Sequence, residues 1–110
     1  MSAWPPPPDL ASIQELVRNA DTEEFIAIHG APLDEYDSEA EDLFAAIGRW
    51  PTDQITVANL APVIEQIWRK SFTYDDETSA KAYPALFGLA VQIAHFFGPE
   101  AKPQVRGGSR

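Results

Sequence analysis

The chain has 110 residues, of which 45% are hydrophobic, a net charge of −9 and no cysteine. This length fits one domain with its own core, and the apolar fraction argues against disorder. The absence of cysteine excludes disulfides, thiolate metal sites and cysteine nucleophiles. The longest apolar stretch, residues 84–97, is too short to span a bilayer, so the sequence favours a cytoplasmic protein.

The negative charge lies in the N-terminal half. Residues 1–55 carry twelve acidic and two basic side chains, whereas residues 56–110 carry five acidic and six basic ones. An acidic surface repels nucleic acids and anionic lipids and speeds encounter with basic proteins. We therefore expect no binding to nucleic acid or membrane, and we expect a basic protein as the partner.

Composition divides the chain into three regions. Residues 1–8 contain four consecutive prolines, which favour an extended polyproline II segment. Residues 9–98 carry the apolar spacing of helices and form the predicted helical domain. Residues 99–110 have the composition of a flexible tail.

Two helices are predicted before Gly30. Asp9 offers an N-cap to a helix whose apolar positions recur every three or four residues up to Ala20. A second, short helix is predicted over residues 22–28, because a capping pattern precedes it and Gly30 can end it.

A third helix is predicted over residues 39–49, with Ser38 as its cap and Pro51 after its end. Residues 52–58 are predicted to be a loop that runs into the fourth helix. The side chains expected on the core side of the third helix are Tyr36, Ala40, Leu43, Phe44, Ile47 and Trp50.

The fourth helix is predicted to begin after an Asn59 cap, with Pro62 in its first turn. Residues 73–79 are polar and are predicted to form a solvated loop after it. The side chains expected on the buried face of this helix are Leu60, Val63, Ile64, Ile67, Trp68 and Phe72.

The last helix is predicted to start at Ala80 or Pro84 and to end at Phe97. It is apolar nearly all round, so it needs cover on most sides. Either the other helices surround it, which is the interpretation that we favour, or one side forms a homodimer interface. The sequence thus predicts an all-α single domain of about five helices packed around this C-terminal helix.

The candidate functional segment is residues 34–42, with six carboxylates and one tyrosine. From Ser38 onward, acidic groups suit the start of a helix because they interact with its dipole. The earlier carboxylates lack a comparable local benefit, and Tyr36 among them has the amphipathic character of an interface anchor. The predicted partner-binding residues are Asp34, Glu35, Tyr36, Asp37, Glu39 and Asp42.

Catalytic and cofactor-binding motifs are missing from the sequence. It contains no Gly-x-Ser-x-Gly turn, no phosphate-binding glycine loop and no EF-hand. We therefore predict a non-catalytic protein without metal or cofactor. The alternative is a small metal-dependent enzyme or metal-binding protein that uses His29 with the acidic cluster, whereas His95 is expected in or beside the core.

The residues from Gly30 to Asp42 resemble an Asp-Glu-Tyr-Asp element in a group of small bacterial proteins. In that group the element follows a short apolar helix and precedes an amphipathic one, and the resemblance covers about residues 20–72. Some such proteins are thought to be immunity proteins for secreted toxins. The resemblance therefore implies an acidic helical domain that neutralises a basic toxin. A homo-oligomeric structural protein is the other alternative.

Overall fold

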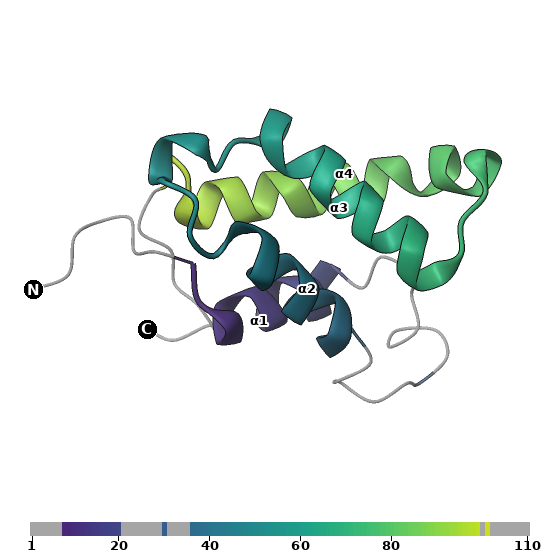
Figure 1. Cartoon of the computed structure of the whole chain (residues 1–110), viewed down its shortest axis with the longest axis horizontal. Helices are drawn as coiled ribbons and strands as arrows, with labels where there is room; N and C mark the ends of the chain where they lie inside the picture. The colour runs from purple at the N-terminus through teal and green to yellow at the C-terminus, as the bar shows by residue number, and fades with distance from the viewer. Residues whose placement is uncertain (1–7, 21–29, 31–35, 100, 102–110) are drawn as a thin grey trace, which may run out of the picture.

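The computed structural model describes residues 8–20, 30, 36–99 and 101. The described residues form four α-helices and one 3-10 turn (Figure 1), namely α1 (Leu10–Ala20), α2 (Asp37–Ile47), η1 (Thr52–Gln54), α3 (Val57–Phe72) and α4 (Asp76–Phe97). They contain no strand, so the all-α prediction is confirmed. The helix predicted over 22–28 lies outside the described residues, as do most of the Pro-rich segment and the tail.

The four helices form a ring of contacts. α1 packs against α2, α2 against α3, α3 against α4, and α4 against α1. In Figure 1, α4 runs behind α3 along the long axis of the molecule, and α1 and α2 lie below them. Because the ring pairs neighbours, α2 and α4 stand diagonally opposite each other.

α1 begins and faces inward as its sequence predicts. The carboxylate of Asp9 accepts a hydrogen bond from the backbone N–H of Ser12 at 2.8 Å, which caps the helix. Ile13, Leu16 and Val17 are buried on one face. The first helix and its cap are therefore confirmed.

α2 starts two residues earlier than predicted, and no side chain caps it. Ser38 lies inside the first turn and is exposed, so its predicted role as the cap is wrong. Tyr36 holds the N-cap position with 0% of its side chain exposed. Burial of a large aromatic ring contributes about 2 kcal/mol, against about 1 kcal/mol for a cap, so packing decides where this helix begins.

α3 starts earlier than its predicted cap. The Thr56 hydroxyl accepts the Asn59 N–H at 3.3 Å, and Asn59 donates its side-chain N–H to the Gln54 carbonyl oxygen at 2.9 Å. The predicted Asn59 cap is therefore wrong, and Pro62 lies inside the helix on its exposed side. There, water can solvate the carbonyl that proline leaves without a donor.

The predicted buried face of α3 is confirmed. Leu60, Ile64 and Trp68 are buried, and the other three predicted positions are half-buried against the same core. After Phe72 the helix ends at Thr73, whose φ of 55° is left-handed. This single left-handed residue turns the chain toward α4.

The loop after α3 is shorter than predicted, because residues 76–79 belong to α4. The carboxylate of Asp75 accepts the Thr78 N–H at 2.7 Å and so caps this helix. That hydrogen bond holds the pKa of Asp75 below its ordinary value. The predicted starts at Ala80 and Pro84 are both wrong, because the acidic residues that suggested a loop suit the first turn of a helix.

α4 ends where Gly98 was predicted to close it, and the chain there packs directly on another loop. A Cβ at Gly98 would collide with the carbonyl oxygen of Ile55 and lie 2.7 Å from that of Ala94. Only glycine allows this approach of two backbones.

α4 is covered on one side only. Its buried side chains, Ser79, Leu86, Leu89, Ala90, Ile93 and Phe97, face the core that it shares with α1 and α3. Beside this buried side, on one flank of the helix, Tyr83 and Phe87 are 39% and 43% exposed. The expectation that other helices surround α4 on most sides is therefore wrong for the described part of the chain. Although α4 has 22 residues, no described helix combines the length and hydropathy of a membrane span.

Candidate functional site

Tyr36 belongs to the core. Its side chain is 0% exposed and is part of the central hydrophobic cluster. The prediction that it faces the core is confirmed, whereas a fully buried ring cannot serve as an exposed interface anchor. Asp34 and Glu35 lie outside the described residues, so their part in the predicted surface stays a prediction.

Asp37 pairs with Arg18 of α1. The Nη2 of Arg18 lies 3.0 and 3.1 Å from the two carboxylate oxygens of Asp37, and Nε lies 3.3 Å from Oδ1. The two side chains are 34% and 27% exposed. A forked, partly shielded pair of this kind restrains the orientation of both helices. Asp37 thus stabilises the contact of α1 with α2, a benefit that the local sequence did not reveal.

The acidic groups that α2 leaves available are Glu41 and Asp42. Both are exposed, and neither forms an ion pair with another described residue. Glu39, by contrast, is only 7% exposed. Ala45 and Ala46 continue the exposed side toward the end of the helix. We call Glu41, Asp42, Ala45 and Ala46 the α2 face.

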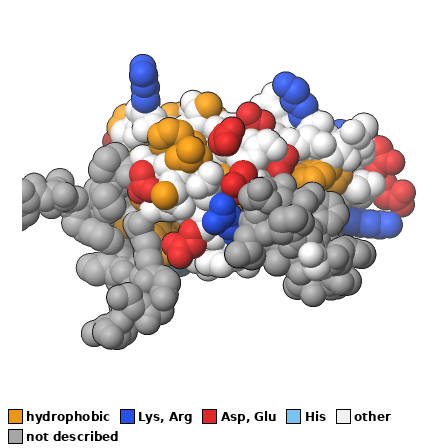
Figure 2. Space-filling view, turned by 90° about the horizontal axis from the view of Figure 1, so that it is seen from below, with side chains coloured by type: hydrophobic (Ala, Val, Ile, Leu, Met, Phe, Trp, Pro, Cys, Tyr) orange, Lys and Arg blue, Asp and Glu red, His pale blue; other side chains and the backbone are white. Residues whose placement is uncertain are grey.

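Acidic side chains do not gather in one patch on the side of the molecule that Figure 2 shows. They are spread among uncharged and apolar side chains, and a cationic side chain lies between them. The predicted site thus divides into groups that belong to the fold and groups that remain exposed.

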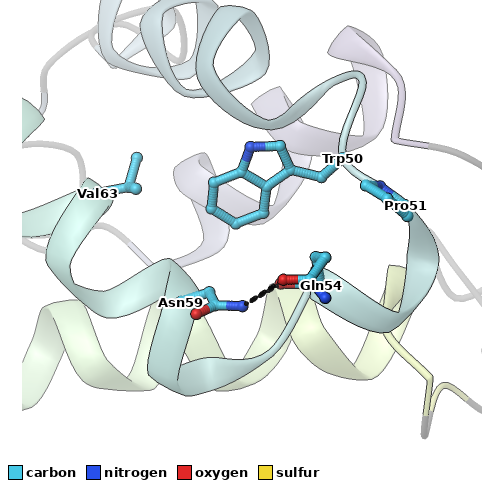
Figure 3. Close-up of a pocket in the computed structure, with 5 residues that line it drawn as sticks. All are labelled: Trp50, Pro51, Gln54, Asn59 and Val63. Carbon is cyan, nitrogen blue, oxygen red and sulfur yellow. Dashed lines mark hydrogen bonds between the residues drawn. The ribbon is translucent and has the colours of Figure 1, made fainter.

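A groove of about 360 Å³ opens beyond the end of α2. Figure 3 shows the indole of Trp50 between the turn that carries Pro51 and Gln54 and the start of α3. Opposite the ring, Asn59 donates its side-chain N–H to Gln54 Oε1 at 3.4 Å. Val63 completes the lining. An aromatic wall beside amide groups suits an apolar side chain flanked by polar backbone.

The groove and the α2 face are close in the sequence, because the groove lining begins just after α2. Asp42 and Ala46 lie one turn apart on one side of α2, and Trp50, which lines the groove, follows three residues after the helix ends at Ile47. Gly48, just after α2, keeps right-handed helical dihedral angles of −59° and −21°. The exposed carboxylates thus lie in the middle of α2, and the groove begins past its C-terminal end. Sequence reasoning missed the groove because its walls come from three segments, and the only signal was a large aromatic residue beside a proline.

A smaller pocket of about 140 Å³ lies at the C-terminal end of α4, beside the exposed His95. Within the described residues, no three or more histidine, aspartate or glutamate side chains gather as metal ligands would. His29, the histidine of the predicted metal alternative, lies outside them. The lining of this pocket is Ile55, Thr56, Val57, Ala94, His95 and Pro99.

Polar groups between α3 and α4 serve helix packing. Ser79, which is 1% exposed, donates its hydroxyl hydrogen to Glu65 Oε2 at 2.8 Å. Arg69 bonds Asp76 at 2.6 Å, and this hydrogen bond raises the pKa of the guanidinium. These contacts join the two helices across the turn that connects them.

Comparisons of the chain with protein-family models, curated proteins and solved structures found no match. The class is therefore defined by the fold and the site, as an all-α globule with exposed carboxylates on α2 and an aromatic groove beyond the end of that helix. The likeness to immunity proteins stays a prediction.

Proposed function

We propose that the chain is a non-catalytic domain that binds a basic protein on the α2 face and in the Trp50 groove. The observation that carries this proposal is that Glu41 and Asp42 of α2 are exposed, without an ion pair to any described residue, and that an aromatic groove lies beyond the end of the same helix. Exposed carboxylates attract a basic partner and accelerate its association. The groove then offers a place for an apolar anchor of that partner.

The more specific form of the proposal is an immunity protein that neutralises a basic toxin. The net charge of −9 supports it, since the acidic excess lies in the half of the sequence that contains α2. In this form Asp34 and Glu35, which precede α2 in the sequence, also bind the toxin. Tyr36 and Asp37 support it from within the fold, through the core and through Arg18.

The test is affinity capture of the partner from the host lysate with the double variant Glu41→Gln/Asp42→Asn. We expect capture to be lost or strongly reduced, and residual capture to weaken further as salt is added. The melting temperature should not change, because both side chains are exposed. Capture of the same partner by the double variant at unchanged affinity contradicts the proposal.

The matched control is Gln66→Lys/Ser71→Lys on the exposed side of α3. It also makes the net charge two units less negative, but away from the α2 face. We expect this control to capture the partner nearly as well as the unmodified chain. Equal losses in both variants would mean that overall charge, and not the α2 face, governs binding.

A further inference from the structure

Tyr83 and Phe87 form an exposed aromatic pair on α4. They lie one helical turn apart with ring centroids separated by 6.1 Å, and they are the large hydrophobic side chains exposed among the described residues. α4 packs against α1 and α3 through the side that carries Leu86, and the aromatic pair lies on a flank of that side. Adjacent exposed aromatic rings are typical of a surface that another molecule covers.

The strip beside this pair carries two residues that weaken an isolated helix. Pro84 has no backbone N–H to donate, and Gly88 has more backbone freedom to lose than any other residue. Both are exposed. A Cβ at Gly88 would meet no atom within 4 Å, so packing within the chain does not require glycine there. Its absent side chain leaves room for a second helix to approach the backbone closely.

Along α4, exposed residues occur in pairs at equal distances before and after the buried Leu86. Pro84 and Gly88 lie two residues to either side, and Glu77 and His95 lie nine residues to either side. The 18 residues from Glu77 to His95 make about five full turns, so the four residues lie within about 20° of one line along the helix. Two copies that cross antiparallel opposite Leu86 would therefore bring Glu77 of each against His95 of the other.

We propose that a second copy of this chain docks on this face through an antiparallel α4–α4 contact about a two-fold axis. The two-fold rotation reverses the direction of the helix but leaves each flank of the contact on the same side. The Tyr83–Phe87 pairs of the two copies therefore lie on the same flank, where they meet and cover each other. At the two ends of the contact, the carboxylate of Glu77 in one copy can accept a hydrogen bond from the imidazole N–H of His95 in the other. A parallel contact would instead bring together the acidic starts of both helices, which include Asp75 and Asp76 and would repel each other.

This dimer goes beyond the proposed function because it uses a different surface. α2 is diagonal to α4 in the ring of helices, so the contact leaves both α2 faces open. The dimer therefore presents two binding surfaces, and a partner with two sites would gain avidity.

Sedimentation over a wide range of concentrations tests the contact. The mass should rise from 12.1 kDa toward twice that value as concentration increases. The variant Tyr83→Glu/Phe87→Glu should stay at the monomer mass, while Gln66→Glu/Ser71→Glu, which adds the same charge to α3, should dimerise like the unmodified chain. An unmodified chain that stays monomeric throughout, or a Tyr83→Glu/Phe87→Glu variant that dimerises normally, overturns the proposal.

Gly88→Gln separates the interface from the fold. Glutamine is a good helix former, so the melting temperature of the monomer should stay the same or rise. The longer side chain should nevertheless weaken dimerisation about tenfold or more, because it holds the two helices apart. Unchanged dimerisation of this variant would contradict the close contact of the two helices.

Disulfide cross-linking tests the antiparallel order, and the chain contains no cysteine that would interfere. Glu77→Cys/His95→Cys should form covalent dimers on oxidation. Glu77→Cys alone should form none, because its two copies would lie about 27 Å apart in an antiparallel pair, far beyond disulfide range. Efficient cross-linking of Glu77→Cys alone, or none in the double variant, overturns the antiparallel order.

Discussion

The exposed sides of α2 and α4 lie diagonally opposite and differ in chemistry. α2 exposes carboxylates and alanines and is followed by a groove, whereas α4 exposes two aromatic rings with a proline and a glycine. Carboxylates are stable in water without a partner, but aromatic rings gain free energy when they are covered. The α4 face is therefore the stronger structural signal of a contact, and the α2 face shows more about the charge of a partner.

The largest expected effect compares two tyrosines. Tyr36→Ala should lower the free energy of unfolding by about 3 kcal/mol, because it empties a buried site in the core. Tyr83→Ala, the same change on the exposed side of α4, should cost less than about 0.5 kcal/mol in the monomer. Urea unfolding at low protein concentration measures both. Equal losses would show that Tyr83 is part of the core and would remove the contrast between the two sides.

The next effect concerns the carboxylates of α2. Asp37→Asn should lower stability by about 1 kcal/mol, because it breaks a forked pair with Arg18 that is partly shielded from water. Asp42→Asn should leave stability unchanged, since Asp42 is exposed. A double-mutant cycle with Arg18→Gln isolates the pair. A coupling energy near zero would mean that Asp37 does not stabilise the fold through Arg18 and counts instead among the acidic residues of the predicted surface.

Ala45 and Gly88 can be compared by two opposite substitutions, glycine to alanine in α4 and alanine to glycine in α2. Both lie inside helices on exposed sides, so Gly88→Ala should stabilise the monomer by about 1 kcal/mol and Ala45→Gly should destabilise it by a similar amount. Thermal unfolding at low concentration compares them. Destabilisation by Gly88→Ala would mean that the monomer needs glycine at this position for its packing or backbone conformation.

The smallest effect is the pH dependence of the cap on α4. The Thr78 hydrogen bond lowers the pKa of Asp75 in the folded state, so its stabilisation is complete above the unfolded pKa, about 4, and is lost as pH falls through the folded pKa. Asp75→Ala should therefore lower the melting temperature at neutral pH and have less effect at about pH 3. A difference that grows in acid would contradict the cap.

Helix positions were more predictable than helix starts. The buried faces of α1 and α3 followed from the spacing of apolar residues, because burial of one helix face depends on periodicity within the segment. The starts of α2, α3 and α4 were misplaced, because several neighbouring residues can cap a helix. In α2 the burial of Tyr36 decided between them.

The candidate site was predictable only in part. The sequence located the acidic segment, but Arg18 lies 19 residues before Asp37, so no local pattern joined them. Trp50 was predicted to face the core, and the structure shows it half-buried at a groove formed where η1 and α3 meet the end of α2. The Arg18–Asp37 pair and the groove both depend on which segments of the chain meet in the folded structure.

By itself, the sequence determined that this protein is helical, which faces of α1 and α3 are buried, and where the acidic charge lies. The tertiary structure decided that Asp37 stabilises the fold, that a groove follows α2, and which side of α4 stays exposed. The physical reason is clearest in α4. A helix that is apolar nearly all round has no polar stripe to mark its outer side, so only its packing against α1 and α3 buries Leu86 and leaves Tyr83 and Phe87 exposed.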